Sequence, residues 1–188
     1  MLLGSVLSLI TLFDNEIISK NKLITLLIWI GLTLVYYCYS LIKMNNIKNI
    51  SLSIQGSTFE IKSGNIFESP DLKVINFNEY FDTQVDNKVI AKNSLNGKFI
   101  LDILKNDTKE IDMEIEKQLA DKIVSNNKDR KSGKKNKYNL GEIVEYKDYL
   151  LTSLTKFTDD NRAILSLKDY LSFLMNFWDN LDKIYANR

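Results

Sequence analysis

Amide and carboxylate side chains follow directly after an apolar stretch in the middle of this 188-residue sequence. Residues 72–77 (LKVINF) are typical of a buried strand, and Asn76, Asn78, Glu79 and Asp82 lie at or just past its carboxyl end. Ligands of open α/β sheets bind beyond the carboxyl ends of strands. An amide both donates and accepts hydrogen bonds, and a carboxylate accepts them from ribose hydroxyls or an exocyclic amine. The segment therefore predicts a site for a sugar or a base.

A second polar segment, residues 93–97 (NSLNG), lies further along the chain. Gly97 lacks a side chain, so its backbone can approach a phosphate closely. The alternative interpretation is a plain Asn-Gly turn with no ligand, because such turns are common and Asn is abundant throughout this sequence.

The composition excludes several classes of chemistry. The chain has no histidine and a single cysteine, Cys38, which rules out Ser-His-Asp and Cys-His catalysis, an intramolecular disulfide and an ordinary zinc site. We expect no metal, no cofactor and no catalytic residue, although the missing histidine does not exclude a reaction that uses a positioned water. The single cysteine fits a reducing compartment. The 25 basic and 24 acidic residues nearly balance, so no nucleic-acid partner is expected.

The periodicity of apolar residues predicts the strands and helices that position these polar residues. Strands are predicted at 58–62, 72–77, 141–146 and 149–155, a short helix at 82–92, and a helix at 112–125. A final helix begins at the capping box Ser166 and Asp169 and carries an apolar stripe from Leu167 to Tyr185. This order predicts an α/β fold, a mixed sheet with helices on both faces.

The N-terminal part has a different character. Residues 23–42 contain no charge, are long enough to cross a bilayer as a helix, and are followed by Lys43 and Lys48. Residues 1–13 are also uncharged, so a helical hairpin in the membrane or a lone interfacial segment are both open. We expect a membrane anchor at 1–49, a soluble domain at 50–188, and the end of the helix facing the cytoplasm.

The chain stops as soon as its final helix ends, at Arg188. The predicted sheet needs a further element after that helix. We therefore expect either a small sheet or a domain that is incomplete at its C-terminus.

Several co-linear blocks carry a resemblance to a known family. They are GNIF at residue 64, the strand leading into NFNEYFDTQVDNKVI, then SLNG, LGEIVEYKDYLLTSLTKF and SLKDYLSFLMNFWDNLDKIYANR. Over residues 54–188 the chain resembles the macro domain, in the divergent form found in the membrane-anchored effector of Thoeris anti-phage defence. The resemblance implies a macro-like fold that lacks its C-terminal part.

Macro domains bind ADP-ribose and its relatives, and the resemblance implies roles for individual residues. Asn65 stands where the family has an aspartate that accepts from the adenine amine. Asn76 and Asn78 stand near the paired asparagines of the ribose site, one residue closer together than usual. The glycine-rich phosphate loop corresponds to Ser94, Leu95, Asn96, Gly97 and Lys98, with only Gly97 retained. A second phosphate loop would follow Arg188.

The resemblance also implies a function. A TIR-domain enzyme makes an ADP-ribose-derived signal, the cytoplasmic macro domain binds it, and the anchor disrupts the inner membrane. The implied partners are that enzyme, through the nucleotide, the lipid bilayer and further copies in a homo-oligomer. An ADP-ribosyl hydrolase remains an alternative. So does a non-catalytic, membrane-tethered interaction domain that uses the basic residues Lys128, Arg130, Lys131, Lys134, Lys135 and Lys137.

Overall fold

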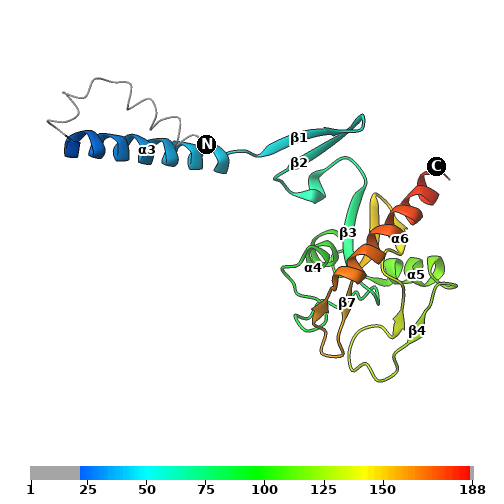
Figure 1. The fold of residues 1–188 in the computed structure, drawn as a ribbon. Helices are drawn as coiled ribbons and strands as arrows, with labels where there is room; N and C mark the ends of the chain where they lie inside the picture. Colours follow the sequence, from blue (N-terminus) through cyan, green and yellow to red (C-terminus); the bar gives the residue numbers. More distant parts are fainter. Residues whose placement is uncertain (1–21, 187–188) are drawn as a thin grey trace. The chain divides into compact units, whose positions relative to one another are not determined.

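The computed structural model describes residues 22–186. Contacts divide the chain into two compact units, Met1–Gly64 and Asn65–Arg188, which are described separately below (Figure 1). The segment 1–13, predicted as a possible membrane helix, lies outside the described residues. The sequence placed the domain boundary after residue 49, whereas the strands at 49–62 group with the N-terminal unit.

The first unit consists of one long helix and a hairpin. Helix α3 (Lys22–Asn45) contains the predicted apolar span, and its segment Leu26–Asn45 has a mean hydropathy of 1.6 with no residue buried. By length and composition it is able to cross a membrane. Strands β1 (Asn49–Ile54) and β2 (Ser57–Lys62) then pair antiparallel. Gln55 and Gly56, at φ +50° and +85°, form the two-residue turn favoured in hairpins.

The second unit is built on a mixed sheet, as predicted. Strand β3 (Lys73–Asn78) pairs parallel with the long strand β7 (Tyr149–Phe157), and β6 (Ile143–Tyr146) pairs antiparallel with the other side of β7. The short strand β8 (Ala163–Ile164) pairs with the end of β7. The strand order is therefore β3-β7-β6.

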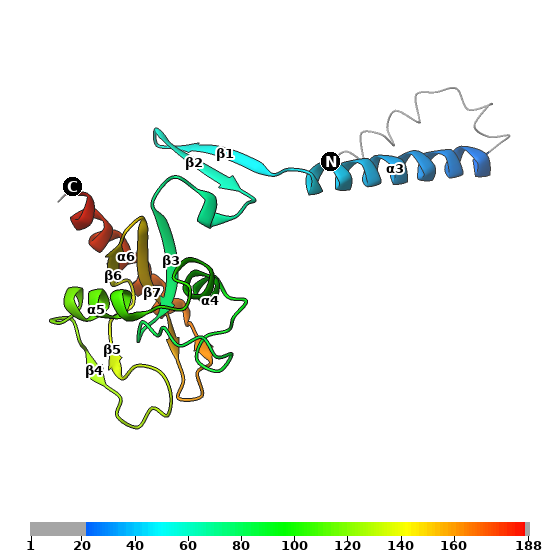
Figure 2. The same cartoon turned by 180° about the vertical axis from the view of Figure 1, so that it is seen from behind.

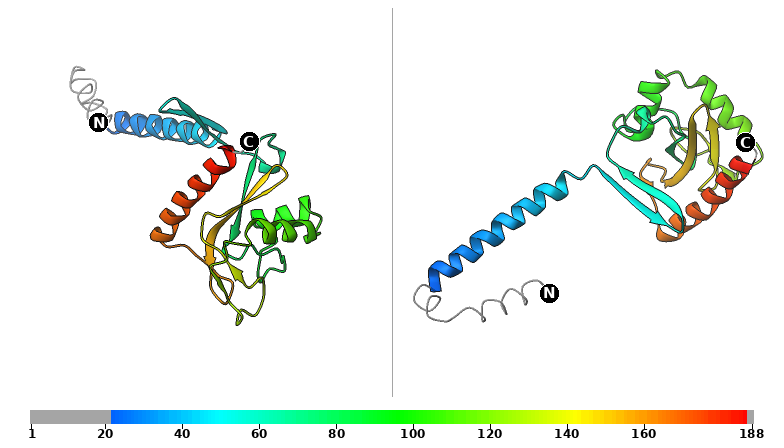
Figure 3. Two further views of the ribbon diagram at one scale, coloured as in Figure 1. Left: turned by 90° about the vertical axis from the view of Figure 1, so that its right-hand side faces the viewer. Right: turned by 90° about the horizontal axis from the view of Figure 1, so that it is seen from above.

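One helix covers one face of this sheet. Helix α6 (Leu167–Ala186) packs through Phe173 and Phe177 against Ile143 of β6 and Leu150 of β7. The left view of Figure 3 shows α6 on one side of the strands and α5 on the other. The final helix is thus confirmed, together with its capping box, in which the Ser166 hydroxyl accepts from Asp169 N at 3.1 Å.

The opposite face is covered by several shorter helices. Ile75 of β3, Val144 of β6 and Leu151 of β7 point into a second, larger core. Alternation along the strands places these residues opposite the set that packs on α6, because successive strand side chains point to opposite faces. The covering elements are α4 (Leu95–Lys98), the single π-helical turn η2 (Phe99–Ile103) and α5 (Lys109–Gln118).

Three short elements complete the unit. A single 3-10 turn η1 precedes the sheet, and a small hairpin lies beside α5, seen from behind in Figure 2. Their bounds are η1 (Ile66–Glu68), β4 (Ser125–Asn126) and β5 (Asn136–Lys137).

The helix predicted at 82–92 is wrong. The segment is a loop in which Asp86 Oδ1 accepts from Lys88 N at 2.8 Å and from Val89 N at 2.7 Å, and Asn87 lies at φ +64°. These backbone donors, Val89 first, lower the pKa of the Asp86 carboxyl. Asp and Asn side chains compete in this way with the helical hydrogen-bond pattern.

The helix predicted at 112–125 is present but displaced toward the N-terminus. Helix α5 begins at Lys109 and ends at Gln118. Its end is fixed by tertiary contacts, because the Gln118 amide donates to Glu145 O at 2.8 Å and accepts from Glu145 N at 2.9 Å on β6. The apolar repeat that continues to Ile123 is therefore not helical over its full length.

Candidate functional site

Asn65, predicted to meet an adenine, caps the 3-10 turn η1. Its Oδ1 accepts from Phe67 N at 3.2 Å, and its Nδ2 donates to Glu68 Oε1 at 2.9 Å. An N-cap asparagine satisfies a backbone donor that the turn leaves open. The side chain is exposed, so a ligand that binds here would compete with the bond to Glu68.

The two asparagines at the end of β3 have different environments. Asn76 is exposed on the strand, where it is in register with Thr152 of β7. Asn78 is buried, and the pairing with β7 shifts between Phe77 and Asn78. Asn78 Nδ2 donates to Asp82 Oδ2 at 2.7 Å, while its Oδ1 accepts from Tyr80 N at 3.0 Å. Asn78 therefore holds the turn after the strand.

Asp82 is the centre of a buried ionic cluster. It accepts from Arg130 Nη1 at 2.9 Å, from Arg130 Nη2 at 2.6 Å and from Lys134 N at 2.6 Å. The exposed fractions of the two side chains are 0% for Asp82 and 1% for Arg130. The guanidinium also lies 4.0 Å from the ring centroid of Tyr80 and donates to Asn161 Oδ1 at 2.7 Å. Asp82 thus ties the loop that contains Arg130 to the end of β3.

The buried role of Arg130 was not predicted from the sequence. Arg130 belongs to the basic residues of loop 126–139, where it is the only arginine. Arg is the residue of choice for a buried, bidentate carboxylate pair, whereas lysine favours solvated positions. That contrast is the signal by which the sequence could have indicated a buried partner.

The predicted phosphate loop forms the short helix α4, which packs beside β3. Ser94 Oγ caps it by accepting from Gly97 N at 3.0 Å. A Cβ on Gly97 would lie 2.2 Å from Ala91 O, so the close approach that requires glycine here is to the protein's own backbone.

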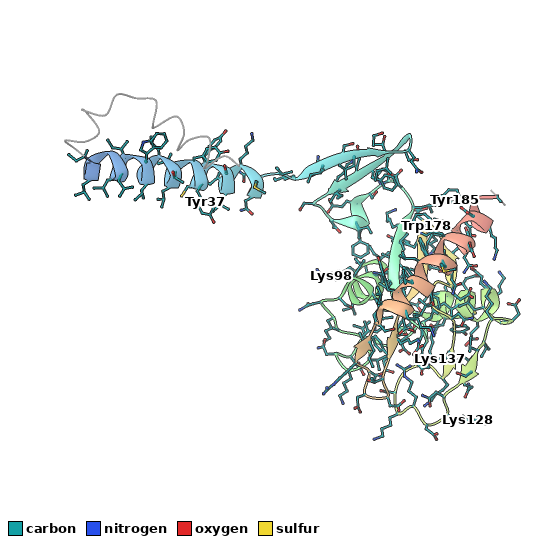
Figure 4. All side chains as sticks on the ribbon, in the orientation of Figure 1. Tyr37, Lys98, Lys128, Lys137, Trp178 and Tyr185 are labelled. Carbon is teal, nitrogen blue, oxygen red and sulfur yellow. The ribbon has the colours of Figure 1, made fainter. Side chains whose placement is uncertain are left out.

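The remaining residues of that loop point in different directions. Leu95 packs against the core, and Lys98, labelled in Figure 4, is exposed. Asn96 is buried with an exposed fraction of 8%, and its Oδ1 accepts no hydrogen bond from the described residues. Asn76, Asn96 and Lys98 thus offer an amide, a buried acceptor and a cation, groups that suit recognition of a polar, anionic ligand.

A pocket of about 380 Å³ lies elsewhere, between α5 and the β4–β5 hairpin. Tyr80, Asp112, Glu116, Lys134 and Tyr138 are among the residues that line it, and burial raises the pKa of the Tyr138 hydroxyl. None of the predicted ligand-binding residues is among the described residues that line this pocket. Over residues 22–186 no group of three His, Cys, Asp or Glu side chains is arranged to hold a metal ion.

Four of the six basic residues proposed as an electrostatic patch are engaged within the fold, and one of them, Lys135, donates from Nζ to Lys128 O at 3.4 Å. Arg130 pairs with Asp82, Lys134 Nζ lies 2.5 Å from Asp112 Oδ1, and Lys137 Nζ lies 3.1 Å from the buried carboxylate of Glu79. Lys128 and Lys131 are exposed. The loop is therefore mainly held in place by its charges, which weakens the case for an electrostatic contact surface.

One family of domains matches most of the chain. The sequence model described as "Thoeris protein ThsA, Macro domain" matches residues 59–188. The chain belongs to this macro-domain family, which confirms the resemblance inferred from the sequence blocks.

A curated relative supports the same assignment. The chain is 39% identical over 188 residues to the Thoeris protein ThsA of Bacillus amyloliquefaciens (strain Y2). The similarity covers 98% of this chain and 63% of that protein, so the chain spans less than two thirds of the length of its relative.

Proposed function

We propose that this protein is a membrane-anchored effector of Thoeris anti-phage defence whose macro domain binds an ADP-ribose-derived nucleotide. The observation that carries the proposal is the match of the ThsA macro domain to residues 59–188. A TIR-domain enzyme supplies the nucleotide, and binding leads to disruption of the inner membrane. The partners are thus the enzyme, through its product, the lipid bilayer and further copies of the chain.

Helix α3 supports the membrane part of the proposal. It is 24 residues long, which at about 1.5 Å per residue exceeds a hydrocarbon core of about 30 Å. Its large apolar side chains are exposed, with exposed fractions such as 59% for Leu27 and 62% for Leu34. Such an apolar surface is suited to contact with lipid acyl chains.

Polar groups around β3 and α4 support the nucleotide part. Asn76 and Lys98 are exposed, and the Oδ1 of Asn96 is buried without a donor among the described residues. A bound nucleotide shifts a conformational equilibrium only if it binds one state better than the other. Helix α4 contacts β3, so it is the element through which we expect that difference to act.

Calorimetry on the full chain in lipid nanodiscs tests the proposal, with ADP-ribose as the probe. We expect measurable binding heat and recovery of the ligand unchanged. Lys98→Gln should weaken binding about fivefold, equivalent to about 1 kcal/mol. Lys128→Gln is the matched control, because Lys128 is an exposed lysine outside the predicted site. Absence of heat with ADP-ribose would contradict the proposal, and a cleaved product would instead indicate a hydrolase.

A further inference from the structure

The hairpin that follows α3 is amphipathic. Its register pairs Ile50 with Ile61 and Leu52 with Phe59, and paired residues of an antiparallel ladder lie on the same face. Together with Ile54 they form the apolar face of the hairpin. The exposed fractions of these five side chains range from 46% for Ile50 to 62% for Ile61.

The other face of the hairpin is polar. The register there pairs Ser51 with Glu60 and Ser53 with Thr58. An isolated two-stranded hairpin is marginally stable in water and needs an apolar surface to pack on. Within its own unit, the described residues leave the apolar face uncovered.

The hairpin begins almost where the apolar helix ends. Helix α3 ends at Asn45 and β1 starts at Asn49, and the intervening turn is ordered because Ile47 N donates to Met44 O at 3.2 Å. Ile50 lies five residues after Asn45, and an extended chain spans at most about 3.6 Å per residue, so the two residues are at most about 18 Å apart. If α3 crosses the bilayer, this short reach keeps the apolar face close enough to contact the bilayer surface.

Charge at this junction also fits a lipid surface. Lys43 lies in the last turn of α3, and Lys48 directly precedes β1. Basic residues at the cytoplasmic end of a membrane helix bind anionic headgroups. Tyr36, Tyr37 and Tyr39 stand one to two turns earlier, as interfacial aromatic residues do.

We propose that the β1–β2 hairpin lies flat on the membrane, with its apolar face in the boundary between headgroups and acyl chains. The anchor is then a helix plus an interfacial β-hairpin, and residues 46–62 are held at the bilayer surface. This inference rests on the membrane insertion of α3 under the proposed function. The partner that this face contacts is an anionic lipid surface.

Site-specific fluorescence on the full chain tests this proposal. In a Cys38→Ser background, single cysteines Leu52→Cys and Ser53→Cys are labelled with NBD. The protein is reconstituted in vesicles of about 3:1 phosphatidylcholine to phosphatidylglycerol. A nitroxide near the top of the acyl chain should quench the label at position 52 about threefold more than at 53, with a blue-shifted emission only at 52. Phe59→Cys and Thr58→Cys repeat the comparison on the other strand.

A label at Leu34→Cys lies near the middle of the apolar span 23–42 and is tested with a nitroxide near the end of the acyl chain. It reports membrane insertion of α3 separately from the position of the hairpin. Quenching at 34 with equal, water-like emission on both hairpin faces would overturn the interfacial hairpin and leave the anchor intact. Absence of quenching at 34 would overturn the membrane part of the proposed function. Self-quenching at position 52 that grows with the labelled fraction, without nitroxide quenching, would show that a second copy covers the face, and would also overturn the inference.

Discussion

At the scale of single residues, the pair Asp82 and Arg130 dominates the candidate site. Both side chains are almost fully buried, and the pair is joined by two hydrogen bonds of 2.9 and 2.6 Å. A buried charge that loses its partner keeps its desolvation cost without the compensating attraction. The cluster therefore holds the loop after β3 and, with it, Asn78 and Asp82 of the predicted ligand-binding residues.

We predict that Arg130→Met destabilises the protein by about 3–5 kcal/mol, because it leaves the Asp82 carboxylate buried without its main partner. Urea unfolding followed by tyrosine and tryptophan fluorescence measures the change. Lys128→Met serves as the control and should stay within about 0.5 kcal/mol of the parent, since Lys128 is exposed. The double variant Asp82→Asn with Arg130→Met should recover part of the loss. A loss below about 1 kcal/mol for Arg130→Met would contradict the role assigned to the pair.

At the scale of elements, the start of α6 is fixed by a charged capping box. Asp169 Oδ1 accepts from Lys156 Nζ at 2.5 Å, and its Oδ2 accepts from the Ser166 hydroxyl at 2.7 Å. The bond from Lys156 first, and that from Ser166 second, lower the pKa of Asp169 to about 2. Lys156 belongs to β7, so the same pair also links the helix to the sheet.

The depressed pKa predicts the pH dependence of this link. A carboxyl with a lowered folded pKa stabilises the fold above its ordinary value of 3.8, and this contribution is lost as pH falls toward about 2. We expect Lys156→Met to move the titration of Asp169 upward toward its ordinary range, as measured by carboxyl NMR. Lys168→Met, next to Asp169 in sequence, should leave the titration in place. An unchanged midpoint in Lys156→Met would show that the Lys156 bond is not the main cause.

At the scale of the whole molecule, the proposed topology places the macro domain in the cytoplasm. Lys43 and Lys48 follow the apolar segment, but Lys20 and Lys22 precede it, so the lysines do not decide the orientation. The cytoplasmic placement rests on the proposed binding of a nucleotide made in the cytoplasm. We predict that a fluorescent protein fused after Arg188 is fluorescent and that a reporter enzyme active only in the periplasm is inactive there. The reverse pattern would overturn the orientation while leaving the family assignment unchanged.

Local sequence patterns predicted much of the fold. The uncharged run in α3, the capping box and stripe of α6, and the apolar runs of β3, β6 and β7 each specify an element through contacts with near neighbours in the chain. The alternation Ile50, Leu52, Ile54 before a Gln-Gly turn also indicates β1, although that strand was not predicted. The helix at 82–92 failed because Asp86 and Asn87 offered the backbone a local alternative.

By itself, then, the sequence determined the elements, the macro-domain family and the approximate position of the amide-rich segment. Only the tertiary structure decided how those amides are used. Asp82 meets Arg130 across 48 positions of sequence, and Asn78 is fixed by the same cluster, whereas Asn76 stays exposed. No local period encodes such pairs, because they depend on the parallel pairing of β3 with β7 and on the loop folded over its end. Burial then forces each charge to find a partner wherever the chain brings one within reach.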